Sequence, residues 1–377
     1  MKFQINKKEI IALTNIVYRA AATKNTIPAL SGLLIEAHSE KGLTFTATDM
    51  EIGIIASTQE VTVIEGGRVL VNAQYFSNII KVLPDTAIDI ELDVNKNKLA
   101  VHYGRSSMNI NISQEYDYPE LPLQNTEELI SIKQKILKEA LRKTGFAAAV
   151  NHFRQIFTGV LFDYCENTLS FVASDTHRLA FYKQAVEEEV REPFNFVVPI
   201  RTVNELLRLL DNSEEKINIS ISKNNVIFNK ENFTFVSRLL EGNYPTYEQV
   251  IPASTNTDIS IKPEVLLETL ERARVLPSDD KIKIPNILLD IKENEINVMA
   301  QSETIGEIND LIDKVQIEGE KYFQITFNTN YVFDIVKVLA GESEELKISL
   351  SGPSTPVIFR EKDKEDYLYV LVPLMAN

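Results

Sequence analysis

The apolar positions along the chain follow two different periods. Between residues 7 and 22, apolar side chains recur every three or four positions, for example at Ile10, Leu13 and Val17, which is the spacing of one buried helix face. Residues 216–222 (KINISIS) instead alternate apolar and polar side chains, which predicts a strand that buries one face. The chain therefore predicts a mixed fold in which helices pack on sheets.

One pattern of an apolar run, a short polar turn and a second apolar run occurs three times. The copies span residues 32–47, 159–173 and 286–300, so that successive copies start 127 residues apart. A second pattern, which predicts a helix, starts at Val71, Val198 and Phe327, with steps of 127 and 129 residues. Two independent patterns with nearly constant spacing indicate a threefold internal repeat.

The repeat predicts three domains, with boundaries in segments near residues 125 and 254 that are rich in Pro, Asn, Ser and Thr. The expected domains are 1–125, 126–254 and 255–377. Each repeat predicts two helices, and the six helices are expected over residues 7–22, 73–83, 133–150, 200–210, 262–276 and 329–340. The remaining apolar runs are short and alternating. The predicted fold class is α+β, with two helices packed on antiparallel sheets in each repeat.

Composition narrows the class of protein. The 377 residues are 44% hydrophobic and 25% charged, as in soluble folded proteins. There is one cysteine, Cys165, so no internal disulfide can form. The sequence predicts neither a secretory signal nor a membrane-spanning segment. We expect a cytoplasmic protein.

The distribution of charge changes the expectation about partners. The net charge of −15 argues against a surface that attracts nucleic acid everywhere. The predicted helices and their flanking residues nevertheless carry about +10, and the rest of the chain about −25. Solvated helix faces could explain this, because Lys and Arg are good helix formers. A shared basic surface that binds the DNA phosphate backbone without sequence preference is the other explanation.

The basic surface would be formed by Lys24, Lys81, Lys133, Lys138, Arg142, Lys143, Arg154, Arg201 and Arg208. Aromatic residues are not interleaved among these side chains in the way that single-strand binding platforms require. Duplex DNA is therefore the expected ligand.

The chain lacks the motifs of common enzymes. The four histidines are scattered and have no cysteine partners, so no metal site is expected, and no nucleotide-binding, hydrolase or zinc-protease motif occurs, so no cofactor is expected. Asp49 and Asp175 occupy equivalent places in two repeats, and the third repeat has Gln301 there. We interpret the two carboxylates as turn caps. Two alternatives stay open, namely a hydrolase or transferase that uses these carboxylates, and a protein-binding scaffold unrelated to DNA.

Three segments resemble one family. Ser174–Ala180 (SDTHRLA), Gly242–Pro252 (GNYPTYEQVIP) and Tyr369–Met375 (YVLVPLM), together with three repeats of this length, resemble the bacterial DNA polymerase sliding clamps, the β processivity subunits of polymerase III. The resemblance covers the whole chain. It implies a non-catalytic, head-to-tail homodimer whose six domains close a ring around duplex DNA, with helices inside and sheets outside.

Helix geometry agrees with a dimeric ring. Helices pack about 10 Å apart, so a circle of six would leave a free radius of about 5 Å and a circle of twelve about 14 Å. A duplex roughly 20 Å across passes only the larger circle. One chain is too small to encircle DNA.

The resemblance also implies a cleft between the second and third repeats that accepts short peptides. The expected ligands come from the replicative polymerase, the clamp loader, repair polymerases and mismatch-repair proteins. The implied cleft residues are Phe157, Ser174, Thr176, His177, Arg178, Leu179, Pro245, Val250, Val370, Val372, Pro373 and Leu374. The chain departs from the more familiar family pattern at Thr176, at Pro356 and in the tail 375–377. These departures bear on peptide preference.

A dimer interface is implied by the same resemblance. It pairs the strand Arg105–Ile110 of one chain with the Val275–Leu276 region of the other. The apolar residues expected there are Ile79, Leu83, Met108, Ile110, Val275 and Leu276. Exposed apolar side chains on a strand edge would be a liability in a monomer.

Overall fold

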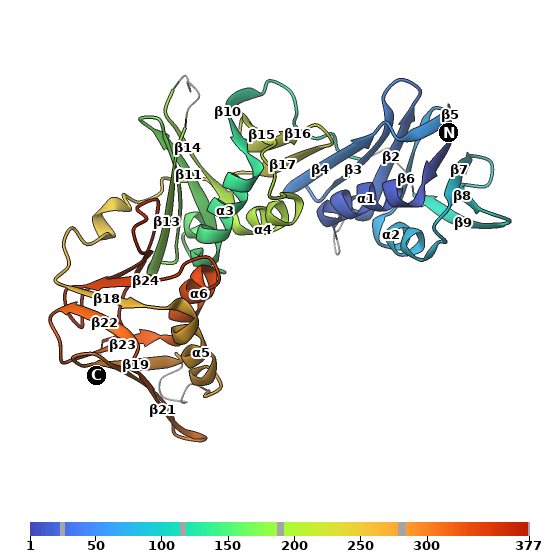
Figure 1. Cartoon of the computed structure of the whole chain (residues 1–377). Coiled ribbons are helices and arrows are strands. Elements are labelled where there is room, and N and C mark those ends of the chain that lie inside the picture. Colours follow the sequence, from blue (N-terminus) through green and yellow to red (C-terminus); the bar gives the residue numbers. More distant parts are fainter. Residues whose placement is uncertain (23–26, 114–117, 187–191, 278–283, 376–377) are drawn as a thin grey trace. The chain divides into compact units, whose positions relative to one another are not determined.

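The computed structural model describes residues 1–22, 27–113, 118–186, 192–277 and 284–375. The chain forms two compact units (Figure 1). Unit 1 contains residues 1–135 and 204–239, and unit 2 contains residues 136–203 and 240–377. The chain passes from one unit to the other three times, within α3 (Gln134–Thr144), within α4 (Ile200–Leu209) and between Leu239 and Leu240.

Unit 1 is built on a single antiparallel sheet of 13 strands. In sheet order the strands are β10 (Glu127–Lys133), β15 (Lys216–Ser222), β16 (Asn225–Lys230), β17 (Phe233–Arg238), β4 (Ile52–Thr58), β3 (Gly42–Thr48), β2 (Gly32–His38), β6 (Gly67–Asn72), β9 (Ser106–Ser113), β8 (Lys98–Tyr103), β7 (Ala87–Asp93), β1 (Lys2–Asn6) and β5 (Val61–Glu65). The pairing of β4 with β17 joins strands of the first and second repeats in one hydrogen-bonded sheet.

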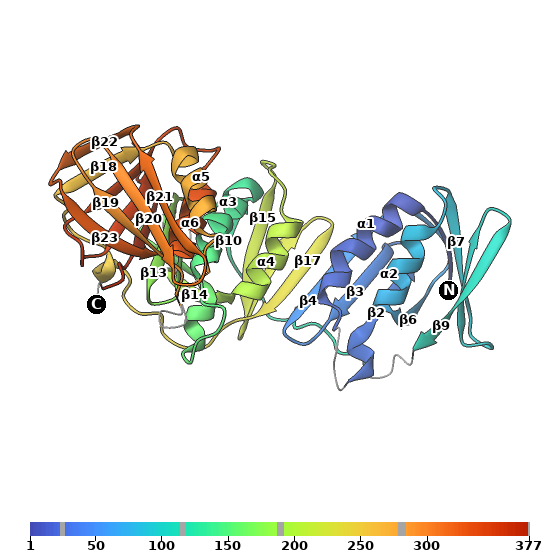
Figure 2. The same cartoon turned by 90° about the horizontal axis from the view of Figure 1, so that it is seen from below.

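Helices α1 (Lys7–Val17) and α2 (Ala73–Val82) lie with α4 on one face of this sheet (Figure 2). Helix α1 buries Ile10, Leu13 and Val17, the stripe that the periodicity predicts. The side chain of Asn72 caps α2, because its Oδ1 accepts a hydrogen bond of 3.1 Å from the backbone N–H of Tyr75. Apolar side chains from the helices and the covered sheet face form the core of the unit.

Unit 2 contains two antiparallel sheets. The nine-stranded sheet has the order β14 (Phe194–Pro199), β11 (Gly159–Cys165), β12 (Thr168–Ser174), β13 (Arg178–Ala185), β26 (Tyr367–Leu371), β25 (Val357–Glu361), β24 (Leu346–Leu350), β18 (Thr257–Ile261) and β22 (Val315–Gly319). The four-stranded sheet has the order β21 (Gly306–Ile312), β20 (Ile296–Ser302), β19 (Asn286–Ile291) and β23 (Phe323–Asn328). Helices α5 (Pro263–Ala273) and α6 (Thr329–Leu339) pack against each other and against the smaller sheet.

The predicted α+β class is confirmed, and each of the six predicted helices is present in the described residues. All six end earlier than predicted, by one residue for α2, α4 and α6, by three for α5 and by more for α1 and α3. Helix α1 gives way to a 3₁₀ turn at Tyr18–Ala20, and α3 gives way to another at Gly145–Ala147, because the chain leaves each helix through an extended residue, Ala21 or Ala148. In the described ranges, no helix is both long enough and apolar enough to cross a membrane.

Candidate functional site

A cleft of about 450 Å³ opens in unit 2. It lies where β12 turns into β13, beside the 3₁₀ turn Gln155–Thr158 and the segment that follows Gly242. Its lining consists of Arg154, Phe157, Ser174, Thr176, His177, Arg178, Leu179, Tyr244, Pro245, Thr246, Tyr247, Gln249, Val250, Pro356, Val370 and Val372. Most of these are apolar or aromatic, which suits a site for an apolar peptide.

The floor and the rim of the cleft differ in burial. Phe157, Leu179 and Val370 are buried in the core cluster below the cleft. Val250 and Val372 are 49% and 42% exposed. A ligand that covers these two rim side chains would remove apolar surface from water against an ordered floor, which is the usual source of affinity at such sites.

The turn that forms one wall of the cleft is held by side-chain hydrogen bonds. Oδ1 of Asp175 accepts from the backbone N–H groups of His177 (3.0 Å) and Arg178 (3.1 Å). Oγ of Ser174 accepts from the N–H of Thr176 (3.1 Å) and donates to the carbonyl of Arg178 (2.7 Å). Thr176 lies in the left-handed region, with φ of 78°. The turn therefore presents Thr176 and His177 at fixed positions.

The first repeat contains the same turn. Oδ1 of Asp49 accepts from the N–H groups of Glu51 and Ile52, both at 3.0 Å, and Met50 has φ of 77°. Thr48 takes the place of Ser174, since its Oγ1 accepts from the N–H of Met50 and donates to the carbonyl of Ile52. The interpretation of both aspartates as turn caps is confirmed.

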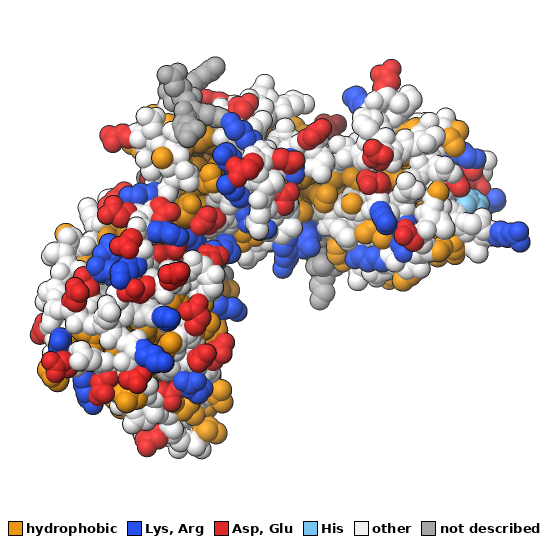
Figure 3. Space-filling view, viewed as in Figure 1, with side chains coloured by type: hydrophobic (Ala, Val, Ile, Leu, Met, Phe, Trp, Pro, Cys, Tyr) orange, Lys and Arg blue, Asp and Glu red, His pale blue; other side chains and the backbone are white. Residues whose placement is uncertain are grey.

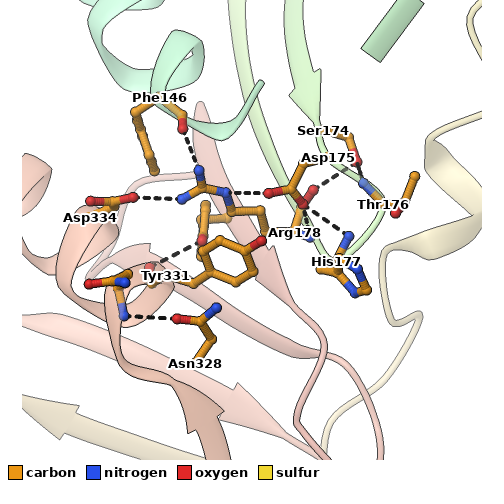
Figure 4. Close-up of polar contacts among 11 residues, drawn as sticks. Phe146, Ser174, Asp175, Thr176, His177, Arg178, Asn328, Tyr331 and Asp334 are labelled. Atoms are coloured by element: carbon orange, nitrogen blue, oxygen red, sulfur yellow. Dashed lines mark hydrogen bonds and ion pairs between the residues drawn. The ribbon is translucent and has the colours of Figure 1, made fainter. Parts of the chain in front are cut away.

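Arg178 ties this turn to two other elements of unit 2 (Figure 4). Its Nε donates to Oδ2 of Asp175 (3.0 Å), its Nη1 to Oδ2 of Asp334 on α6 (2.7 Å) and its Nη2 to the carbonyl of Phe146 (2.7 Å). The guanidinium carbon also lies 4.3 Å from the ring centroid of Tyr331. The side chain is only 9% exposed. Arg178 therefore holds the cleft wall in place, and its positive charge is compensated by Asp175 and Asp334.

The structure brings together ten of the twelve predicted cleft residues. Pro373 and Leu374 are not among the residues that line this cleft. The backbone N–H of Leu374 donates to the carbonyl of Thr326 (2.8 Å), so the chain beyond Val372 runs along β23 instead. The lining residues that were not among the predicted cleft residues are Arg154, Tyr244, Thr246, Tyr247, Gln249 and Pro356. Four of them lie within the quoted motif Gly242–Pro252, which was the available signal.

Two predicted DNA-facing residues have other roles. Lys143 is 1% exposed, and its Nζ lies 2.7 Å from Oε1 of Glu361, also 1% exposed, and 2.9 Å from Oε1 of Glu139. Burial lowers the pKa of Lys143, but the hydrogen bonds to both carboxylates outweigh it and hold the pKa above its ordinary value. Arg154 lines the cleft, with its guanidinium 5.1 Å from the ring of Phe157. A charge count along a helix does not show which basic side chain turns inward.

The other predicted basic residues are exposed or half-buried, and several are paired with acids. Lys133 lies 2.9 Å from Glu214, Arg208 2.7 Å from Glu205, and Arg142 pairs with Glu342. Lys81 lies over the ring of Tyr18. Lys138 is half-buried and Arg201 exposed, and Lys24 lies outside the described residues. On the visible face of unit 2, acidic and basic side chains are interspersed (Figure 3). On that face, the two signs of charge are therefore not segregated.

The residues predicted for a dimer interface divide into two groups. Leu83 and Ile110 are buried within their own chain, so they are core residues and not part of a free patch. Val275 is 77% exposed, and Ile79, Met108 and Leu276 are half-buried. Val275 and Leu276 form a hydrogen-bonded turn after α5, since their N–H groups donate to the carbonyls of Arg272 and Ala273. Val275 and Leu276 could therefore contribute apolar side chains to an interface, but they form no strand with which Arg105–Ile110 could pair.

The described residues contain no group of three or more His, Cys, Asp or Glu side chains placed to hold a metal ion.

Models of one protein family match nearly the whole chain. Three models match in chain order: the DNA polymerase III beta subunit N-terminal domain over residues 1–122, its central domain over 131–246 and its C-terminal domain over 248–375. The chain belongs to the DNA polymerase III beta subunit family.

Individual relatives agree with the family models. The beta sliding clamps of Bacillus subtilis and Halalkalibacterium halodurans are 31% and 32% identical to the chain, and each alignment covers 99% of both proteins. The crystal structure of the DNA polymerase sliding clamp from Bacillus subtilis is 30% identical and superposes with a TM-score of 0.92 over 100% of both chains.

Family membership establishes the function in outline. The chain is a DNA sliding clamp of DNA polymerase III, a processivity factor that is not itself catalytic. The alternatives of a hydrolase or transferase, and of a scaffold unrelated to DNA, are wrong. Asp49 and Asp175, the carboxylates on which the first alternative depended, cap turns.

Proposed function

We propose that two copies of the chain assemble head to tail into a ring around duplex DNA, with repeats 1–125, 126–254 and 255–377 as the six domains of the dimer. Strand β9 supports one half of the interface. It pairs with β8 from Ser106 to Asn111 and with β6 only at Ile112 and Ser113. Within the described residues, its outer edge from Ser106 to Asn111 has no partner strand. Met108 is half-buried on this strand.

Strand β21 supports the other half. It pairs with β20 and with no second strand of the described part of the chain. Its Leu311 is 60% exposed. Helix α5 packs against β21, partly through Arg272, whose Nε donates to Oδ2 of Asp310 (2.6 Å). The exposed Val275 directly after α5 therefore belongs to the same surface region. We assign backbone pairing of β9 with β21 of the partner, flanked by Met108, Leu311 and Val275.

The basic side chains on the helices would face the DNA. Lys138 and Arg201 are the best candidates, because Lys138 forms no ion pair with a carboxylate of the described residues and Arg201 is exposed. Pairs such as Lys133 with Glu214 reduce the positive charge elsewhere. A weakly basic lining suits a clamp, because strong phosphate contacts hinder sliding and such a lining makes few of them.

A direct test of the ring uses its topology. The clamp is loaded on nicked circular DNA, and its retention is measured before and after the circle is linearised. A ring should stay on the circle and leave rapidly through the free ends. Equal loss from circular and linear DNA would contradict the proposal.

The cleft of unit 2 would bind short apolar peptides of the polymerase and of other replication and repair proteins. The observation that carries this proposal is the half-exposed pair Val250 and Val372 above a buried apolar floor. Val372→Arg places a charge in this groove and should abolish polymerase stimulation while the ring still stays on circular DNA. Unchanged stimulation by the variant would contradict a role for the cleft.

A further inference from the structure

Four aromatic rings form a continuous ladder from the floor of the cleft to solvent. Ring centroids are 5.8 Å apart for Tyr244 and Phe157, 5.0 Å for Phe157 and His152, and 4.5 Å for His152 and Phe153. Tyr244 and Phe157 line the cleft. The ladder ends at Phe153, which is 88% exposed, and Val150, three residues earlier in the chain, is 97% exposed.

The outer part of the ladder is held in place. Nδ1 of His152 lies 3.1 Å from the backbone nitrogen of Arg154 and 3.2 Å from its carbonyl oxygen, and these contacts hold the His152 ring against the rings on either side of it. The Phe153 ring therefore rests against a fixed neighbour, His152, while most of its surface is exposed to solvent. Its free face adds an apolar surface directly to the end of the cleft.

Arg154, the residue after Phe153, places a cation in the cleft lining. The guanidinium of Arg154 lies over the Phe157 ring, and among the described residues no carboxylate is recorded as its partner. In contrast, Arg178 on the same cleft is compensated by Asp175 and Asp334. Arg154 can therefore offer its hydrogen-bond donors to a carboxylate of a ligand.

We propose that Val150, Phe153 and Arg154 form an extension of the cleft that binds the flank of a partner peptide, through an aromatic side chain stacked on Phe153 and a carboxylate paired with Arg154. The inference rests on the proposed function of the cleft, and continuity with the cleft lining is what favours a peptide as the occupant. The extension would distinguish partners whose apolar anchors are similar, because only some would carry the aromatic and acidic flank.

Selection from a phage library of random twelve-residue peptides tests the extension on the full chain. Peptides selected by the wild type should share apolar anchors and, at a fixed offset, an aromatic residue with a nearby acid. Selection by Phe153→Ser should keep the anchors and lose the aromatic residue. A synthetic peptide from the wild-type selection should bind Phe153→Ser about tenfold more weakly, whereas Phe153→Trp should retain binding. Tyr322→Ser, which changes another exposed aromatic residue of unit 2, is the matched control.

Three results would overturn the extension. They are an absence of aromatic enrichment with the wild type, equal affinity of the peptide for Phe153→Ser, and displacement of the peptide by a single-stranded oligothymidylate from the wild type but not from Phe153→Ser. The last result would make the ladder a nucleobase platform. Failure of the cleft function itself has another signature, namely that Val372→Arg binds the selected peptide as well as the wild type does, or that the wild type selects no peptide.

Discussion

Thr176 carries backbone strain at the wall of the cleft. A β-branched residue with φ of 78° is held in a region that costs L residues roughly 1–2 kcal/mol. Thr176→Gly should relieve this strain, although glycine also gains entropy in the unfolded chain. We expect a net stabilisation of about 0.5 kcal/mol, measured as a higher urea midpoint. Thr176→Val keeps the branched side chain and should show no gain, and an equal gain in both variants would contradict the strain argument.

The buried pair of Lys143 and Glu361 makes a second residue-scale prediction. Lys143→Met should destabilise the chain by about 3 kcal/mol, because Glu361 loses its buried partner and keeps only Lys364. The double variant with Glu361→Gln should recover much of this loss. Lys138→Met, on the same helix, is the control and should change stability by less than about 0.5 kcal/mol. Urea unfolding gives both values, and a double variant as unstable as the single one would refute the coupling.

The same pair should make stability depend on acid pH. Burial raises the pKa of Glu361, but hydrogen bonds from Lys143 and Lys364 outweigh it and lower the pKa below its ordinary value. A lowered folded-state pKa gives stability that is present above the unfolded pKa of about 4.3 and is lost as the pH falls through the folded value. Thermal midpoints below about pH 4.5 should therefore fall less steeply in Glu361→Gln than in the wild type. Glu60→Gln, which changes an exposed carboxylate between β4 and β5, should behave as the wild type does.

At the scale of elements, the sequence predicts what depends on local period. The alternation in 216–222 predicts β15 with its observed bounds, and the six helices follow from spacing and repeat. The pairing of β4 with β17 is not predictable in this way, because nothing local relates residues so far apart. The inward turn of Lys143 and the path of the chain after Val372 depend on the same long-range packing. Most of the cleft was found because its residues lie in recognisable motifs.

The open edge of β9 makes the prediction at this scale. Met108→Glu should place a carboxylate on the edge that we assign to the partner, and like other charges on strand edges it should oppose pairing. We expect the solution mass to fall from that of two chains to that of one. Ile64→Glu changes an apolar residue of β5 that is 62% exposed and lies outside the assigned interface, so this variant should stay dimeric. If the Met108→Glu variant remains dimeric, the interface does not involve this edge of β9.

At the scale of the whole molecule, weak phosphate contacts should be visible in the salt dependence of DNA binding. Lys138→Glu combined with Arg201→Glu removes two basic side chains that we place toward DNA. The slope of log affinity against log salt should decrease in magnitude by about 2. Lys41→Glu, in the turn between β2 and β3, should leave the slope unchanged. A slope that responds equally to both changes would show only the effect of net charge.

The pairing of β4 with β17 also bears on how the polypeptide can be divided. Five residue pairs, from Phe233 with Ala56 to Ser237 with Ile52, hold the first repeat to strands of the second independently of the connecting segment. A backbone cut after Asn125, which is exposed, would break the covalent link and leave this ladder intact. Two separately expressed fragments, 1–125 and 126–377, are therefore expected to reassemble on mixing, which makes the clamp a candidate for a split-protein reporter.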